Sequence, residues 1–278
     1  MLRSFKDLES YKVSTLDGEL GRVTDFLFDD QHFTTRYLVA NTSGFWKVPS
    51  EVLISPLSFR EVDPAKRLFH LGLTQDKMRN SPSLDLHRPV SRQYEREYFR
   101  YYGWPGYWED GESAAQAMGA YPDARDDGSG KDERKRAKKE HNDPHLRSAK
   151  EVAGYHVQGR DGEIGHIADF IVDDETWTIR YLVLDTSNWW IGHKVLVAPY
   201  WMQEVSWSER KVYLELTKDA IKNSPAWSPE ALVSREYEES LYDYYGRTAY
   251  WLRVHGKGTG VACQSSPVSH IRTAMDAR

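Results

Sequence analysis

The stretch that decides the fold is DGELGRVTDFLFDDQHFTTRYLVANTS, residues 17–43, because the chain contains it twice. Residues 161–187, DGEIGHIADFIVDDETWTIRYLVLDTS, align with it without a gap at a constant offset of 144, and 15 of the 27 positions are identical. Many other positions exchange similar residues, such as Phe33 for Trp177. A repeat of this length indicates a duplicated structural unit, so we expect two copies of one domain.

The repeat continues beyond this block at an offset of 143. Residues 91–103, SRQYEREYFRYYG, match residues 234–246, SREYEESLYDYYG. One residue has therefore been lost or gained in between, which is a change that a surface loop tolerates. The duplicated unit is about 100 residues long and includes its own C-terminal element.

The segment between the copies has a different composition. It contains GESAAQAMGA, DARDDGSG and KDERKRAKKE, with few β-branched or aromatic residues. Such a polar segment cannot bury enough apolar surface to offset the entropy lost on ordering, so we expect a flexible linker. The predicted organisation is a first repeat at 1–108, a linker at 109–149, a second repeat at 150–251 and a flexible tail at 252–278.

The distribution of charge argues against nucleic acid as a specific partner. The chain has 42 acidic and 37 basic residues and a formal net charge of −5. The run at 131–140 and the segment 252–278 each carry +3, which leaves −11 on the other residues. An acidic body repels a phosphate backbone, and domains that bind nucleic acid usually show a basic surface.

Other features bound the cellular setting. One cysteine, Cys263, leaves no internal disulfide and is typical of a reducing compartment. The first ten residues lack the apolar core of a signal peptide. The most apolar stretch, residues 179–201, is interrupted by Arg180 and Lys194, unlike a membrane-spanning helix. We therefore expect a cytoplasmic protein whose contact with a membrane, if it has one, is peripheral.

Alternating apolar residues and turn signals predict six short strands in each copy. Asp17-Gly18 is a tight-turn signal that makes the first two strands a hairpin, and Asp29-Asp30 turns the chain into the third. Six short strands separated by turns favour a small closed barrel over an open sheet with exposed edges. The expected strands of the first copy are 11–15, 21–28, 34–41, 52–54, 58–62 and 67–73, with counterparts in the second.

Each copy should end in a helix. Ser91 and Ser234 are N-cap candidates, and a glycine follows the last expected turn in both copies. Aromatic and apolar residues recur at spacings of three and four, which predicts one hydrophobic face on each helix. We expect these faces to pack the two repeats against each other, through Tyr94 and Tyr98 in one copy and Tyr237 and Leu241 in the other.

Residues 154–199 carry a recognisable pattern. It reads Gly-Tyr-x-Val, then Asp-Gly-Glu-x-Gly-x-Ile, Asp-Phe-Ile-Val-Asp-Asp, Arg-Tyr-Leu-Val and Val-Leu-Val-Ala-Pro. This pattern resembles the PRC-barrel family. The first copy differs mildly, for example in having Ser10 in place of Gly154. The resemblance covers roughly 65 residues of each repeat.

The resemblance implies a six-stranded barrel that serves as a protein-interaction or scaffolding module, without catalytic residues or a cofactor. The family includes the cytoplasmic barrel of the photosynthetic reaction centre H subunit and the C-terminal barrel of the ribosome-maturation factor RimM. H subunits have a transmembrane helix before the barrel, and RimM-like proteins have a separate N-terminal domain. We see neither feature in this sequence.

Several acidic residues invite a catalytic or metal-binding interpretation. Asp25 and Asp169 alternate with apolar residues, so a carboxylate faces the inside. We expect it to accept hydrogen bonds from the backbone or from Arg36 and Arg180, because buried charges are generally paired. We expect Asp29-Asp30 and its counterpart to be turn residues, since two adjacent carboxylates lack the further oxygen ligands that a hard cation needs. The histidines show no metal-ligand spacing.

The loop in which the two copies differ in length supplies the candidate binding residues. They are Phe45 and Trp46 in the first copy and Trp189 and Trp190 in the second. Aromatic side chains anchor interfaces because they bury a large rigid area at a low entropy cost. The alternative is that these rings fold back over the mouth of the barrel.

The sequence thus favours a non-enzymatic adaptor whose two barrels pack together or form a homodimer and bind an unknown protein partner. No metal, cofactor or catalytic residue is expected. An accessory factor of a membrane electron-transfer complex, like the reaction centre, is the alternative. A ribosome-assembly factor is less favoured because the body is acidic.

Overall fold

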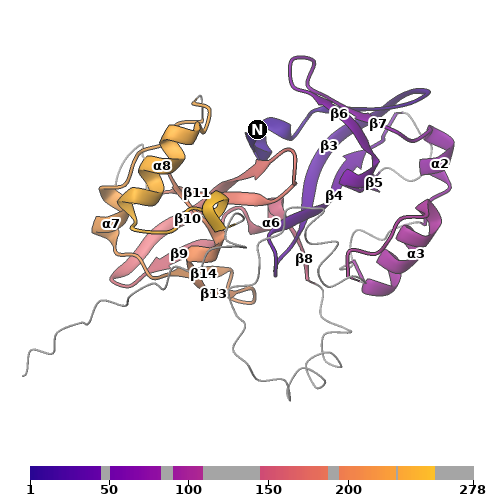
Figure 1. Ribbon diagram of the computed structural model, residues 1–278. Helices are drawn as coiled ribbons and strands as arrows, with labels where there is room; N and C mark the ends of the chain where they lie inside the picture. Colours follow the sequence, from indigo (N-terminus) through magenta and orange to yellow (C-terminus); the bar gives the residue numbers. More distant parts are fainter. Residues whose placement is uncertain (45–50, 83–89, 109–144, 187–193, 230, 254–278) are drawn as a thin grey trace, which may run out of the picture.

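Two similar mixed β-sheets, one for each repeat, form the framework of the molecule (Figure 1). The computed structural model describes residues 1–44, 51–82, 90–108, 145–186, 194–229 and 231–253. The predicted mainly β fold class is confirmed.

Six strands of the first repeat form one sheet and follow the predicted ranges closely. They are joined in the order β5-β4-β3-β2-β7-β6, with β2 and β7 parallel and the other neighbours antiparallel. The elements are β1 (Leu2–Ser4), α1 (Phe5–Leu8), β2 (Lys12–Thr15), β3 (Gly18–Asp29), β4 (Thr34–Asn41), β5 (Glu51–Ile54), η1 (Pro56–Ser58), β6 (Phe59–Asp63), β7 (Leu68–Leu71), α2 (Gln75–Arg79) and α3 (Arg92–Tyr102).

The second repeat reproduces this topology. Its strands are joined in the order β12-β11-β10-β9-β14-β13, with β9 and β14 parallel. The elements are β8 (Leu146–Ser148), α6 (Ala149–Val152), β9 (His156–Gly159), β10 (Gly162–Asp173), β11 (Ile179–Asp185), β12 (Lys194–Val197), η3 (Pro199–Trp201), β13 (Met202–Ser206), β14 (Lys211–Leu214), α7 (Lys218–Lys222), α8 (Arg235–Tyr244) and α9 (Tyr250–Arg253).

Each sheet has a seventh strand that comes from the other repeat. Strand β1 pairs with β10, and β8 pairs with β3. Residues 146–149 fall within the predicted linker, but they form β8 and begin α6. The linker prediction therefore ended too late, and the N-terminal strand of each repeat was missed.

A glycine in each long strand explains part of the repeated sequence pattern. A Cβ atom at Gly21 would lie 2.0 Å from the carbonyl oxygen of Asn41, and one at Gly165 would lie 2.0 Å from that of Asp185. Both glycines also have a positive φ, near 150°. Only a residue without a side chain allows this approach of β3 to β4 and of β10 to β11.

The helix ends follow the sequence signals. The side chain of Ser91 accepts a hydrogen bond from the backbone N–H of Tyr94 at 3.2 Å, and Gly103 ends α3 in the left-handed conformation. Ser234 caps α8 in the same way. Helices α3 and α8 lie on opposite flanks of the molecule (Figure 1). In the described parts of the chain, no helix has the length and apolar character needed to span a lipid bilayer.

One hydrophobic core runs through both repeats. The ring of Phe5 stacks on Phe26 of its own sheet, with centroids 4.2 Å apart, and lies 5.7 Å from Phe170 of the second repeat. Phe28 also meets Phe170, at 5.6 Å. A second, smaller cluster seats α3 on the outer side of its own sheet. The two repeats therefore share one interior, as a single body does.

Candidate functional site

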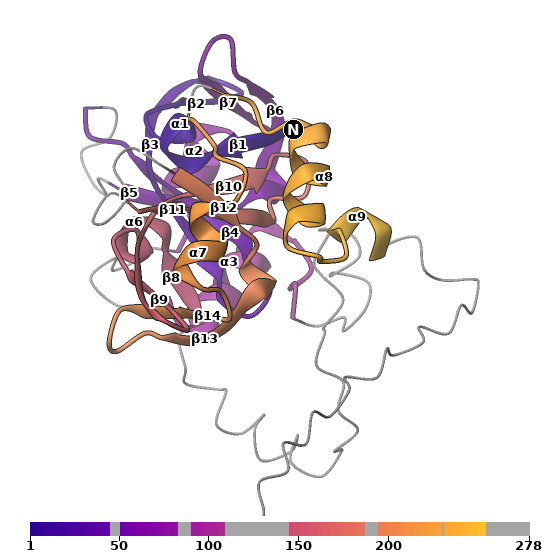
Figure 2. The same ribbon diagram turned by 90° about the vertical axis from the view of Figure 1, so that its left-hand side faces the viewer.

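The seam between the repeats is formed by reciprocal strand exchange. Leu2, Arg3 and Ser4 lie opposite Asp173, Val172 and Ile171, and the equivalent residues Leu146, Arg147 and Ser148 lie opposite Asp29, Phe28 and Leu27. Figure 2 shows β1 beside β10 at the centre of the molecule. Each repeat thus completes the sheet of the other.

Asp25 and Asp169 fasten these exchanged strands. The carboxylate of Asp25 accepts hydrogen bonds from the Ser148 hydroxyl, at 2.6 Å, and from the backbone N–H of Lys150, at 3.1 Å. Asp169 accepts from the Ser4 hydroxyl and from the Lys6 N–H in the same way. The predicted backbone hydrogen bonds are confirmed. Arg36 and Arg180, which the sequence offered as alternative donors, bind Asp29 and Asp173.

These two aspartates resist ionisation. Burial raises the pKa of Asp25 and of Asp169, while hydrogen bonds from the exchanged serine and from backbone N–H groups lower it in part. The net direction is upward in both repeats. The seam therefore places one partly desolvated carboxyl group of each repeat under the first turn of the other repeat's N-terminal helix.

Ion pairs and backbone contacts add to the seam. Arg147 Nε donates to Asp30 at 2.8 Å, and its counterpart Arg3 donates to Asp174 at 2.6 Å. Between the sheets, Thr34 forms an isolated antiparallel bridge with its own equivalent, Thr178. Because equivalent residues meet there, the two repeats are related by a local twofold axis through this bridge.

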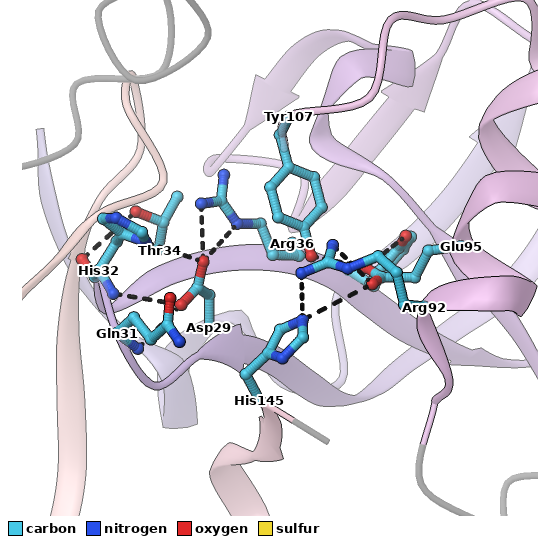
Figure 3. Close-up of polar contacts among 10 residues, drawn as sticks. Asp29, Gln31, His32, Thr34, Arg36, Arg92, Glu95, Tyr107 and His145 are labelled. Carbon is cyan, nitrogen blue, oxygen red and sulfur yellow. Dashed lines mark hydrogen bonds and ion pairs between the residues drawn. The ribbon is translucent and has the colours of Figure 1, made fainter. Parts of the chain in front are cut away.

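The acidic turn of each repeat is occupied by internal donors. Asp29 accepts a hydrogen bond from the backbone N–H of Gln31 at 2.8 Å, and it contacts the His32 ring and Arg36 (Figure 3). Burial opposes ionisation of Asp29, but the hydrogen bond from His32 and the charge of Arg36 outweigh it and hold the pKa of Asp29 well below its ordinary value. The turn role predicted for this aspartate is confirmed.

A buried glutamate connects each C-terminal helix to its sheet. Glu95 has no exposed surface and accepts hydrogen bonds from Tyr37 at 3.2 Å and Tyr107 at 2.6 Å, while Arg92 Nη1 lies 2.9 Å away (Figure 3). Burial raises the pKa of Glu95, and the charge of Arg92 lowers it in part. The guanidinium group of Arg36 lies 3.9 Å from the centre of the Tyr107 ring and links this cluster to Asp29.

The second repeat keeps the same cluster. Glu238 accepts hydrogen bonds from Tyr181 at 2.7 Å and Tyr250 at 3.1 Å, and it pairs with Arg235 at 3.0 Å. Arg180 lies over the Tyr250 ring at 4.2 Å. Because both copies keep every member of this set, its common role is to attach the helix to the sheet.

Two histidines distinguish the copies. His145 contacts Arg92 and lies 3.9 Å from Glu95, whereas the equivalent position in the other half of the seam is Met1 (Figure 3). His32 is replaced by Thr176, whose hydroxyl donates to the equivalent aspartate. The polar cluster of the first repeat therefore has two histidine rings beside it, His32 from its own repeat and His145 from the segment that leads into β8.

A cleft of about 410 Å³ opens between the repeats at one side of the seam. Strand β6 and η1 of the first repeat form one wall, and the turn between β10 and β11 forms the other. Its residues are Pro56, Leu57, Phe59, Arg60, Glu61 and Val62 from the first repeat, and Asp174, Glu175, Thr176 and Trp177 from the second. The cleft exists only because the two repeats are assembled.

The predicted contact residues on the helices face their own repeats. Tyr98 donates to the carbonyl of Leu53, and the hydroxyls of Tyr94 and Tyr237 donate to the carbonyls of Pro82 and Pro225. Leu241 is fully buried at the position equivalent to Tyr98. The prediction that these four residues pack one repeat against the other is thereby corrected, since the exchanged strands form the seam.

The other predicted binding residues lie outside the described residues. They are Phe45, Trp46, Trp189 and Trp190, and their binding role stays a prediction. Among the residues that the structure describes, no group of three or more histidine, cysteine, aspartate or glutamate side chains is placed to hold a metal ion.

The sequence held a signal for the seam that the predicted start of the second repeat, at residue 150, left out. Leu2-Arg3-Ser4 is identical to Leu146-Arg147-Ser148 at the same offset of 144 as residues 17–43. This match extends the repeat to its exchanged strand. The match does not show which sheet this strand joins, because pairing with either sheet is compatible with the same alternation of apolar and polar residues.

Comparison with known proteins identifies one domain. No curated protein matches the chain. The family model of the PRC-barrel domain matches residues 144–221, a range that begins just before the exchanged strand β8 and ends in α7. The second repeat therefore contains a PRC-barrel domain.

Proposed function

We propose that the chain is a non-enzymatic protein-interaction module built from two PRC-barrels, the first repeat being a second copy of the domain matched at 144–221. The similar sheets and the offset of 144 support this duplication. In this proposal the module works in the cytoplasm as a rigid scaffold.

The reciprocal strand exchange is the observation that carries the proposal. It fixes both barrels in one body, so that surfaces from different repeats keep a constant relative position. A preorganised surface of this kind binds a partner without the cost of ordering two independent domains. The buried carboxylates support a role without catalysis, because Asp25, Asp29 and Glu95 are engaged by donors from the chain itself.

The test is cross-linked affinity capture with the full chain as bait and a synthetic peptide of residues 109–144 as the control bait. We expect a protein partner that is retained by the full chain and not by the peptide. Retention of the same proteins by both baits, or of none by the full chain, would count against the module. Substituting both Trp189 and Trp190 with alanine in the same assay tests the loop: unchanged capture would exclude it from the contact surface.

A further inference from the structure

We propose that the apolar side chains around the local twofold axis make the seam selective, so that the first repeat pairs with a second repeat and rejects another copy of itself. Phe5 and Ala149 decide this selection. They hold equivalent positions, as the first residues of α1 and α6. The seam therefore closes within one chain by matching a large side chain with a small one.

The polar contacts of the seam do not distinguish like from unlike repeats. Both exchanged strands read Leu-Arg-Ser, and both pair with equivalent residues of the opposite sheet. Their serines donate to the equivalent residues Asp25 and Asp169, and their arginines donate to Asp30 and Asp174. Two first repeats, or two second repeats, would make all of these contacts. Selection between repeats therefore has to come from the apolar side chains.

Phe5 lies against two equivalent rings. Its ring stacks on Phe26 of its own repeat, with centroids 4.2 Å apart, and lies 5.7 Å from Phe170, which is the equivalent of Phe26 in the second repeat. A ring that meets both members of an equivalent pair lies close to the axis that relates them. Phe5 is 2% exposed and Ala149 is 4% exposed, so both positions are enclosed. The interior at this axis thus holds one phenyl ring and one methyl group.

Pairs of like repeats would not fill this interior correctly. Two first repeats would bring two copies of Phe5 to the axis, and a close-packed core accepts an extra ring only through shifts of side chains and backbone. Two second repeats would bring two copies of Ala149 and leave a cavity in place of the ring, which destabilises a core. A pair of unlike repeats supplies one residue of each size, so the packing favours it.

Two neighbouring positions differ in the same direction. Leu8 of α1 is replaced by Val152 in α6, and Phe28 of β3 is replaced by Val172 in β10. All four side chains are buried, and the ring of Phe28 lies 5.6 Å from that of Phe170 across the seam. The first repeat therefore places the larger side chain at three equivalent positions of the seam, which strengthens the misfit of like pairs.

One position differs in the opposite direction. Trp177 of the second repeat replaces Phe33, and its ring lies 5.0 Å from Phe59 of the first repeat. The equivalent of Phe59 in the second repeat is Met202. Two second repeats would set Trp177 against Met202 and would lose this contact between rings. The large residue of the second repeat thus also has its matching partner on the first.

Exchanging the two residues in the full chain tests the size matching. Phe5→Ala opens a cavity and Ala149→Phe overfills the core, so each should lower the urea midpoint of unfolding by about 1 M. The double variant again has one ring and one methyl group at the axis, and we expect its midpoint to lie above those of both single variants. The control combines Ala149→Phe with Phe99→Ala, which removes a ring from the separate cluster under α3, and its two losses should add.

A mixture of the two single variants tests the selection between repeats. Chains with Phe5→Ala carry two small residues and chains with Ala149→Phe carry two large ones, so a matched pair of repeats forms only between one chain of each kind. After both variants are unfolded in urea and refolded together, light scattering should show a species of twice the chain mass. The unsubstituted chain and each variant refolded alone should give single chains.

Two results would overturn the proposal. One is a double variant that unfolds at or below the midpoint of either single variant. The other is a mixture without the two-chain species, or with no more of it than each variant forms alone. If Ala149→Phe does not fold by itself, a folded double variant is the expected rescue, and a double variant that also fails to fold contradicts the size matching.

Discussion

Asp25 and Asp29 are four residues apart on one strand, yet their surroundings move their pKa values in opposite directions. Asp25 receives neutral donors, and burial prevails, so its pKa is raised. Asp29 faces the cation Arg36 and the His32 ring, which outweigh burial and lower its pKa. The type of partner, more than the depth of burial, decides the direction.

This contrast predicts opposite effects of pH on stability. Because the folded-state pKa of Asp25 lies above its ordinary value of 3.8, the folded chain binds more protons there, and the contribution of Asp25 falls as the pH rises through that window. The stability difference between the unsubstituted chain and Asp25→Asn should therefore decrease from about pH 4 to pH 7. The decrease amounts to about 1.4 kcal/mol for every tenfold difference in the acidity of this carboxyl group between the folded and unfolded chain. Urea denaturation at each pH measures it.

Asp29→Asn is the matched control. The folded-state pKa of Asp29 lies below its ordinary value, so its contribution is complete above about pH 4 and is lost as the pH falls toward the folded-state pKa. The difference between the unsubstituted chain and this variant should shrink on acidification. If the stability difference changed with pH in the same direction for both variants, the assignment of the two environments would be contradicted.

A second prediction at this scale concerns Glu95. Glu95→Gln removes the charge that faces Arg92, whose side chain is 19% exposed, and it weakens two tyrosine hydrogen bonds in a buried cluster. We expect a loss of about 2–4 kcal/mol in the free energy of unfolding. Glu238→Gln should cost less because its partner, Arg235, is 48% exposed and better solvated. Chemical denaturation of both variants measures the two losses in the free energy of unfolding. If the loss for Glu238→Gln equalled or exceeded that for Glu95→Gln, the exposure of the arginine would not be decisive.

At the scale of elements, local sequence signals predicted what is locally determined. The strand ranges followed from alternation and turn residues, and Ser91 and Gly103 fixed both ends of α3. The partners of Asp25 could not be predicted in this way, because they come from Ser148 and Lys150, more than 120 residues later. The aromatic face of α3 was predicted correctly as a packing face, but its pattern carries no information on which surface it covers.

The strand exchange predicts that removing a strand of one repeat reduces hydrogen-exchange protection in the sheet of the other. Deleting residues 1–4 removes β1, whose backbone pairs with β10 at residues 171–173. Hydrogen exchange should therefore rise in the second repeat, at β10, while the equivalent part of β3 stays protected by β8. Faster exchange confined to the first repeat would contradict the exchange of strands.

At the scale of the whole molecule, two copies share one hydrophobic core and have unequal surfaces. The interior is shared, and the Glu95 and Glu238 clusters are the same in both halves. Two of the differences lie near the seam, at His145 and at Glu175 beside the cleft. Duplication explains this pattern, because one copy of a surface can change while the other copy and the common core remain as they are.

The covalent connection between the repeats should therefore be dispensable once the chain is folded. A protease site inserted between Gly130 and Lys131 allows the folded protein to be cut into two fragments. The exchanged strands, the Thr34–Thr178 bridge and the shared core hold the fragments together, so they should co-elute as one species of the original size in gel filtration. The control is the same cut chain with Asp25 and Asp169 both changed to alanine. The hydroxyls of Ser4 and Ser148 then lose their acceptors. The two fragments of this variant should therefore separate at a lower urea concentration than those of the cut chain that keeps both aspartates. Two separate fragments without urea would show that the linker, and not the seam, holds the repeats together.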